Sequence, residues 1–191
     1  MQVMDEGKRL RILAAAAEYF AAQPFHKVLL SDVAQAAGVG KGTLYTYFKS
    51  KDDLYLAILY SGFTRLVERL RSRICEETHG PAENLEMTVR EIVYFAYQNP
   101  CLFELMRNIS SRKTIDRSKW GEKRKELMSL IESIIRQGIR RQEFADPHPE
   151  LTARFIPGLI RSVMIEAAPA VDRQTLTEHI LRFVKAALTC T

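Results

Sequence analysis

Lysines and hydroxyl-bearing side chains gather in one short stretch of the chain. These residues are Lys41, Thr43, Tyr45, Tyr47, Lys49 and Lys51. No acidic residue occurs from Val33 to Lys51, although the first 60 residues as a whole carry seven Lys and Arg against six Asp and Glu. Ammonium and hydroxyl groups bind phosphate oxygens. The local placement therefore predicts a nucleic-acid-binding surface; the alternative is that Lys49 and Lys51 only solvate a turn.

Two short helices joined by a tight turn are predicted to position this stretch. The first spans about 31–37, Gly38 supplies a left-handed turn, and the second spans about 41–48. At 100° per residue, Leu44 and Phe48 share the inward face of the second helix. The outward positions are Gly42, Thr43, Tyr45, Thr46 and Lys49. This is a helix-turn-helix arrangement over about 29–48, whose second helix enters the major groove.

The run from Val33 to Leu54 resembles the DNA-binding domain of TetR-family transcriptional regulators. The resemblance implies an all-α homodimer that binds a palindromic operator, usually represses, and leaves DNA when a small molecule enters the C-terminal domain. By position, it brings Lys41, Gly42, Thr43, Tyr45 and Thr46 to base edges and Tyr47 and Lys51 to phosphates. Lys49 is included among the expected DNA-binding residues. Such a Lys can donate to guanine, and a Thr methyl can touch a thymine methyl.

Two positions depart from the family pattern. Gly40 stands where the family usually has Ser, Thr or Asn, so the recognition helix lacks an N-cap hydroxyl. Leu29 stands near the usual place of a Thr that caps the preceding helix and touches the DNA backbone. We expect Ser31 to take over as the cap two residues later.

Helical periodicity continues through the rest of the chain. Helices are predicted at about 8–22, 50–75, 82–98, 102–109, 150–167 and 172–188, with a basic loop in 110–125 leading into a helix that ends near 141. Ser50 and Asp53 have capping-box spacing at the start of the long helix. We therefore predict an N-terminal DNA-binding domain at 1–52 and a C-terminal helical dimerisation and effector-binding domain at 53–191.

The last two predicted helices are unusually apolar, and the apolar surface of 150–167 is too wide for one wet face. A central core helix is one interpretation. The favoured one is a subunit interface in which two helices from each chain form a four-helix packing. Its expected residues are Phe155, Leu159, Val163, Ile180 and Val184.

Aromatic and methionine side chains of the C-terminal half either line an effector cavity or fill the core, and core is the default for each. They are Tyr94, Phe95, Tyr97, Phe103, Met106, Trp120, Met128, Phe155 and Met164. The polar side chains able to anchor a ligand are Glu91, Arg107, Arg161, Glu166 and His179. The effector itself stays unknown, and a regulator without an effector is an alternative.

Other classes of protein find little support in the sequence. Cys75, Cys101 and Cys190 are far apart, and the four histidines have no metal-ligand spacing, so we expect reduced thiols, no metal and no cofactor. No nucleophile–base pair or phosphate-binding glycine loop indicates an enzyme. Without a secretion signal or an apolar run of about 20 residues, we expect a cytoplasmic protein with no membrane partner. A helical interaction or membrane-surface protein using the basic 110–125 stretch is the alternative.

Overall fold

The computed structural model describes residues 5–74, 79–109, 118–166 and 170–188. All regular secondary structure within these ranges is helical, which confirms the all-α prediction. Cys75, Cys190, the side chain of Arg107 and the first half of the basic 110–125 stretch, residues 110–117, lie outside the residues so described. No described helix is long and apolar enough to cross a membrane.

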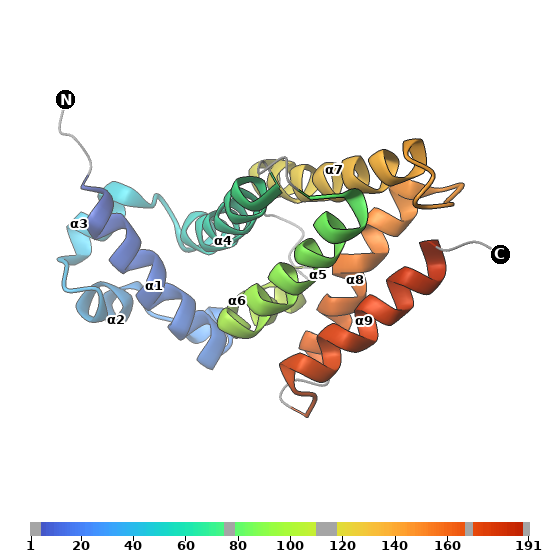
Figure 1. The fold of residues 1–191 in the computed structure, drawn as a ribbon. Coiled ribbons are helices and arrows are strands. Elements are labelled where there is room, and N and C mark those ends of the chain that lie inside the picture. The colour runs from blue at the N-terminus through green and yellow to red at the C-terminus, as the bar shows by residue number, and fades with distance from the viewer. Residues whose placement is uncertain (1–4, 75–78, 110–117, 167–169, 189–191) are drawn as a thin grey trace.

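Three helices and one 3-10 turn form the N-terminal end of the molecule (Figure 1). They are α1 (Glu6–Ala22), η1 (Phe25–Lys27), α2 (Leu30–Ala36) and α3 (Lys41–Tyr47). Asp5 caps α1, since its carboxylate accepts a hydrogen bond from Lys8 N at 3.2 Å. Gly38 has φ 65°, the left-handed conformation that the turn between α2 and α3 was predicted to need.

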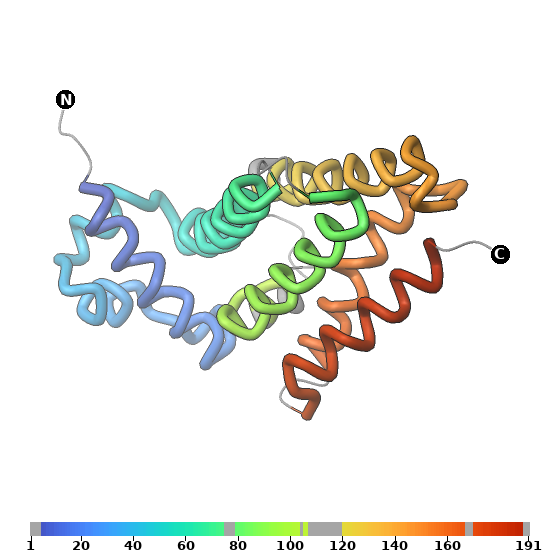
Figure 2. Tube along the Cα trace, in the orientation of Figure 1, coloured from blue at the N-terminus to red at the C-terminus, as the bar shows by residue number. Residues whose placement is uncertain are grey.

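Helix α4 (Lys51–Ile74) is the longest element of the described chain and begins at the predicted cap. The Ser50 hydroxyl accepts a hydrogen bond from Asp53 N at 3.0 Å. The Asp53 carboxylate reaches back to Lys49 N at 2.9 Å, one residue before the cap. Helix α4 passes through the expected domain boundary at residue 52 without a break, so that boundary stays a prediction; Figure 2 shows it leading from the N-terminal helices into the C-terminal layer.

The C-terminal half packs further helices around α4 and around each other. They are α5 (Pro81–Gln98), α6 (Pro100–Ile109), α7 (Ser118–Arg140), α8 (Pro149–Glu166) and α9 (Arg173–Leu188). Three of them start at a proline, one or two residues before the predicted start, because proline suits the first helical turn. Pro157 lies inside α8, where it cannot donate a backbone hydrogen bond.

Helix α6 connects the two halves of the molecule. It packs against α1 and α4 on one side and against α8 and α5 on the other (Figure 1). Leu102 and Leu105 of α6 are buried. A Cβ atom added at Gly62 of α4 would lie 2.5 Å from Leu102 Cδ1, so a larger residue at this close approach of α4 and α6 would displace the Leu102 side chain.

Candidate nucleic-acid interface and ligand cavity

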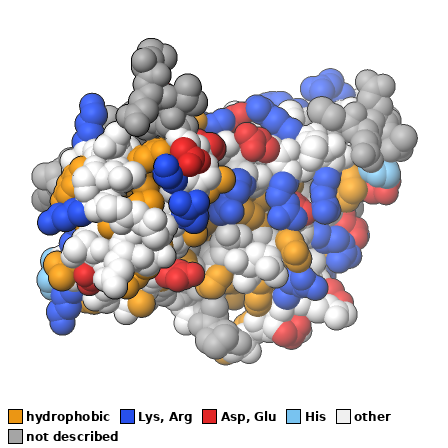
Figure 3. All heavy atoms as spheres, turned by 90° about the vertical axis from the view of Figure 1, so that its left-hand side faces the viewer, with side chains coloured by type: hydrophobic (Ala, Val, Ile, Leu, Met, Phe, Trp, Pro, Cys, Tyr) orange, Lys and Arg blue, Asp and Glu red, His pale blue; other side chains and the backbone are white. Residues whose placement is uncertain are grey.

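Helix α3 exposes one face and buries the other. Leu44 is fully buried and Phe48 is 3% exposed, whereas the Tyr45 side chain is 46% exposed. The other exposed residues of the predicted DNA-binding set are Lys41, Gly42, Thr46 and Lys49, while Thr43, Tyr47 and Lys51 are half-buried. Figure 3 looks at this end of the molecule and shows Lys and Arg side chains spread over it, with Asp and Glu side chains and apolar and uncharged groups among them.

The Thr46 hydroxyl donates a hydrogen bond to Gly42 O at 3.1 Å, within α3. This local bond uses the hydroxyl proton, so the side chain can offer its methyl group and the acceptor lone pairs of its oxygen to a partner. A cap hydroxyl is absent at the start of the helix, because the N-cap is Gly40. Its Cβ position is open, with the nearest atom, Thr43 Oγ1, at 3.8 Å.

Tyr47 and Lys51, the expected phosphate-binding pair, already contact the protein. The Tyr47 hydroxyl donates to Asp5 O at 3.1 Å, so a phosphate would compete for its single proton. Lys51 Nζ donates to His26 O at 3.3 Å and lies 4.7 Å from the centre of the Phe25 ring. An ammonium group has three donors, so these contacts are compatible with a phosphate contact.

The expectation that Ser31 caps α2 is wrong. Helix α2 begins at Leu30 with Leu29 as its N-cap, and no side chain makes a cap hydrogen bond. The Ser31 hydroxyl bonds instead to Asp32 Oδ1 at 3.1 Å. Ser31 is therefore inside the helix rather than in front of it, and Leu29 presents a 56% exposed side chain where the family pattern has a Thr.

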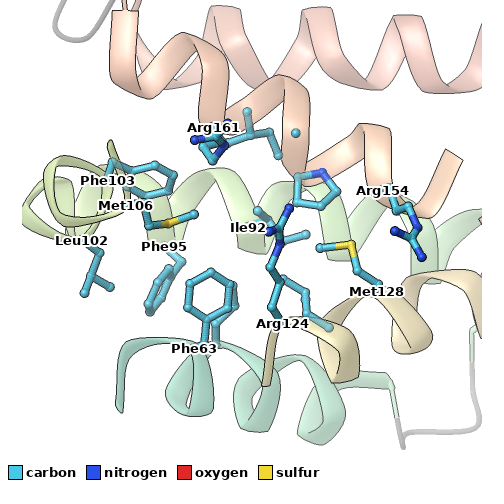
Figure 4. A pocket seen from close by; sticks show the side chains of 15 residues that line it. Phe63, Ile92, Phe95, Leu102, Phe103, Met106, Arg124, Met128, Arg154 and Arg161 are labelled. Carbon is cyan, nitrogen blue, oxygen red and sulfur yellow. The ribbon is translucent and has the colours of Figure 1, made fainter. Parts of the chain in front are cut away.

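An apolar cavity lies among helices α4 to α8 (Figure 4). Its lining includes Phe63, Leu66, Ile92, Phe95, Leu102, Phe103, Met106, Leu127, Met128 and Ile160. Its enclosed space is about 60 Å³, and the volume including its open mouth is about 610 Å³. Arg124, Arg154 and Arg161 also line it, together with Pro157 and Gly158. Figure 4 shows Arg124 extending from α7 toward α8.

Sequence reasoning found part of this cavity. Of the nine aromatic and methionine candidates, the four that line it are Phe95, Phe103, Met106 and Met128. Of the candidate polar anchors with described side chains, Arg161 lines it. Glu91 is buried and lines a different cavity, and Glu166 and His179 are exposed elsewhere. Phe63, Arg124 and Arg154 were missed. The seven-residue spacing of Arg154 and Arg161, which places them on one face of α8, was the available signal.

The expected interface residues fall into two groups. Phe155 is 57% exposed, and Leu159 and Val163 are half-buried. Ile180 and Val184 are only 4% and 3% exposed, because α9 packs that side against α5 and α8 of its own chain. These two residues are part of the protomer's core, so their assignment to an interface is corrected. The exposed apolar residues missed on the same helices are Leu151 and Phe183.

Comparisons with known proteins agree with this architecture. The family model "Bacterial regulatory proteins, tetR family" matches residues 12–58, and the model "Tetracyclin repressor-like, C-terminal domain" matches residues 78–165. The chain is similar to the uncharacterized HTH-type transcriptional regulator YhgD of Bacillus subtilis, with 26% identity over 91% of this chain and 92% of the relative. It is also similar to the fatty acid metabolism regulator protein of the same species, with 24% identity over 73% of this chain and 72% of the relative.

A solved structure shares the fold over nearly the whole chain. The transcriptional regulator FadR from Bacillus subtilis, in complex with stearoyl-CoA, superposes with a TM-score of 0.82 and 22% sequence identity. The match covers 95% of this chain and all of that one. The helix-turn-helix geometry, the helical C-terminal half and both family matches together place the chain in the TetR family of transcriptional regulators.

Proposed function

We propose that the protein is a cytoplasmic homodimeric repressor that binds a palindromic operator and leaves it when a fatty acyl ligand with an anionic head enters the apolar cavity. The observation that carries the proposal is an apolar cavity lined by three arginines and in contact with both α4 and α6. A ligand that fits it has an apolar body and a negatively charged end.

The cavity lining separates two kinds of contact. Phe63, Phe95 and Met106 offer rings and a thioether to an acyl chain, a contact that gains about 25 cal/mol per Å² of apolar surface. Guanidinium groups bind carboxylates and phosphates through paired N–H donors. The stearoyl-CoA complex of Bacillus subtilis FadR supports an acyl-CoA thioester as the ligand, since that molecule combines both parts.

The small enclosed volume gives the ligand a way to change the protein. The interior of about 60 Å³ is smaller than a long acyl chain, so we expect entry of the chain to move the surrounding helices apart, with the rest of the ligand in the open mouth. Helices α4 and α6 both line the cavity, and α4 leads directly to the DNA-binding end. A ligand can shift the equilibrium only by its differential affinity for the two states, typically about 1–3 kcal/mol.

Two copies of α3 at a fixed separation would read the operator. Recognition helices that enter the major groove on one side of DNA lie about 34–36 Å apart, or a multiple of that distance. We propose Lys41, Thr43 and Tyr45 as base-edge contacts, with Gly42 and Thr46 beside them. Tyr47, Lys49 and Lys51 are proposed as backbone contacts. The second copy of the chain would bind to the apolar residues exposed on α8 and α9, which are Leu151, Phe155 and Phe183.

Fluorescence anisotropy on promoter fragments from the source genome tests the proposal. We expect one fragment to bind more tightly than its shuffled sequence, and palmitoyl-CoA to reverse that binding. Coenzyme A without an acyl chain is the ligand control. Arg124→Gln with Arg161→Gln should weaken the acyl-CoA response at least tenfold, while Arg136→Gln with Arg140→Gln removes the same charge from the far end of α7 and should not.

Three outcomes would each contradict a different part of the proposal: DNA-sequence recognition, the acyl effector or repression. Equal affinity for specific and shuffled DNA contradicts the regulator function. Specific binding that no acyl-CoA reverses supports the alternative of a regulator without this effector. A fragment whose transcription rises when the protein is added in vitro contradicts repression.

A further inference from the structure

A second cavity lies outside the apolar one, between the C-terminal half of α4, a different face of α5 and the beginning of α9. Its volume is about 580 Å³, on the measure that gives about 60 Å³ for the apolar cavity. It opens to solvent, and its lining is polar. Four arginines line it: Arg69 and Arg73 from α4, Arg90 from α5 and Arg173 from α9. We refer to it as the arginine cavity.

One carboxylate is buried at the arginine cavity. Glu91 is 2% exposed, and its two oxygens pair with Arg69 Nη2 at 2.8 Å and Arg73 Nη1 at 3.2 Å. The first contact is an ion pair without hydrogen-bond alignment, so Oε1 has no aligned donor among the described residues. A single carboxylate thus fixes two guanidinium groups and neutralises only one of their charges.

An aromatic ring fixes a third guanidinium group. The Tyr94 ring lies 5.3 Å from the guanidinium carbon of Arg69 and 5.4 Å from that of Arg173. Contacts of this kind hold planar cations against the ring through its quadrupole. Arg173 makes no ion pair with a described residue, although Glu178 lines the same cavity.

The fourth arginine, Arg90, is held by a carboxylate next to the cavity. The cavity as a whole keeps an excess of positive charge. Arg90 donates to Glu86 Oε1 at 2.8 Å, and Glu86 also accepts from Lys185 at 2.8 Å. The acidic residues that line the cavity are Glu91 and Glu178. With the adjoining Glu86 and Lys185 included, five cationic groups stand against three carboxylates, which leaves an excess of two positive charges in a site large enough for a small molecule.

We propose that the arginine cavity binds a small oxyanion with at least two negative charges, either a phosphate ester or a polycarboxylate. Each guanidinium offers a planar pair of donors that matches a carboxylate or phosphate edge. The ligand would relieve the repulsion among arginines of three helices and join α4 to α9. This site shares no lining residue with the apolar cavity, so the proposal does not depend on the acyl ligand.

Isothermal titration calorimetry on the full chain, with pyrophosphate and citrate at constant ionic strength, tests this site. We expect at least one of the two anions to bind with a stoichiometry of one per chain. Binding of pyrophosphate alone indicates a phosphate ester, and binding of citrate alone indicates a polycarboxylate. If neither binds more tightly than sulfate, the cluster is only a structural ion-pair network and the proposal is wrong.

Arg90→Gln with Arg173→Gln is the informative variant. It removes two positive charges but keeps Arg69 and Arg73, without which Glu91 would be a buried unpaired charge. Glu86 keeps Lys185 as a partner. We expect anion affinity to fall at least tenfold while circular dichroism and DNA affinity stay unchanged. Arg136→Gln with Arg140→Gln is the charge-matched control, and an equal loss in that variant would overturn the assignment to this cavity.

Discussion

The hydroxyl of Tyr55 donates a hydrogen bond to the main-chain oxygen of Leu105 at 2.6 Å, and neither residue is more than 1% exposed. This bond joins the first half of α4 to α6. The Tyr55 ring also meets Phe20 of α1 and Phe25 of η1 edge to face, at centroid distances of 5.1 and 5.6 Å. Residue 105 of α6 is thus bonded to a tyrosine that packs against α1 and η1 of the DNA-binding end, while residues 102, 103 and 106 of the same helix line the apolar cavity.

Tyr55→Phe should weaken the effect of the ligand on DNA affinity while the protein still folds. Removing the hydroxyl loses one buried hydrogen bond, which lowers the free energy of unfolding by about 1–2 kcal/mol. DNA affinity without ligand should change little, while the reduction of that affinity by palmitoyl-CoA should become smaller. Urea denaturation and DNA anisotropy measure the two effects. Tyr19→Phe, at a half-buried position of α1, is the control. An unchanged ligand response in Tyr55→Phe would contradict coupling of the cavity to the DNA-binding end through the Tyr55–Leu105 hydrogen bond.

Gly62→Ala tests the close approach of α4 and α6. The new methyl group would lie 2.5 Å from Cδ1 and 3.1 Å from Cδ2 of Leu102. Leu102 also lines the apolar cavity, so its displaced side chain would enter the space that the acyl ligand needs. We expect unfolding to become easier by about 1–3 kcal/mol and acyl-CoA affinity to fall at least tenfold. Gly121→Ala, where no atom lies within 4 Å of the added Cβ, is the control.

Gly42→Ala should have opposite effects on stability and DNA binding. Gly42 lies on the exposed face of α3, and no atom lies within 4 Å of a Cβ added there. Replacing a helical glycine with alanine stabilises a helix by about 1 kcal/mol. The same methyl group would hold the α3 backbone away from DNA, so operator affinity should fall. Thermal unfolding and anisotropy check the two results, and unchanged operator affinity would show that this position does not approach the DNA.

Helix positions could be predicted from the sequence because caps, prolines and periodicity are local signals. The capping pair Ser50 and Asp53 and the turn at Gly38 are confirmed for that reason. The apolar cavity depends instead on how five helices meet, and Phe63 and Arg124 come together there from positions 61 residues apart. No local pattern distinguishes such a cavity-lining phenylalanine from a core phenylalanine.

Helix α9 shows a related limit. Its apolar residues lie on more than one face, and the sequence does not tell which face meets α5 and α8 of the same chain. The structure buries Ile180 and Val184 and exposes 55% of the Phe183 side chain. The positions of α5 and α8 decide which face of α9 is buried, and the residue pattern of α9 alone does not contain those positions.

Glu126→Gln should lower stability in a pH-dependent way. A hydrogen bond from Lys123 at 2.8 Å and the nearby Arg71 hold the pKa of Glu126 below its ordinary value. A carboxyl group with a lowered folded-state pKa stabilises the protein above its unfolded pKa, and this contribution disappears as the pH falls through the folded pKa. Since the groups are partly exposed, we expect a loss of about 0.5–1 kcal/mol at pH 7.

Urea denaturation from pH 7 to pH 3 measures this effect. The difference between the wild type and Glu126→Gln should begin to shrink below about pH 4.5, where the carboxyl group of the unfolded chain gains its proton, and should vanish once the pH is below the lowered folded-state pKa. Glu122→Gln, at an exposed position one helical turn away on α7, is the control and should follow the wild type. A difference that persists at pH 3 would contradict an electrostatic origin.

Phe155→Glu with Phe183→Glu tests the proposed dimer. These side chains are 57% and 55% exposed on α8 and α9, and Leu151, at 42%, lies one turn from Phe155. Two carboxylates in an apolar contact between copies would lose their hydration without gaining partners. We expect monomers in light scattering and operator affinity lower by about 100-fold, because two linked half-site contacts reinforce each other. Leu10→Glu, at a 50% exposed position on α1, should remain dimeric; dimers in both variants would place the interface on another face.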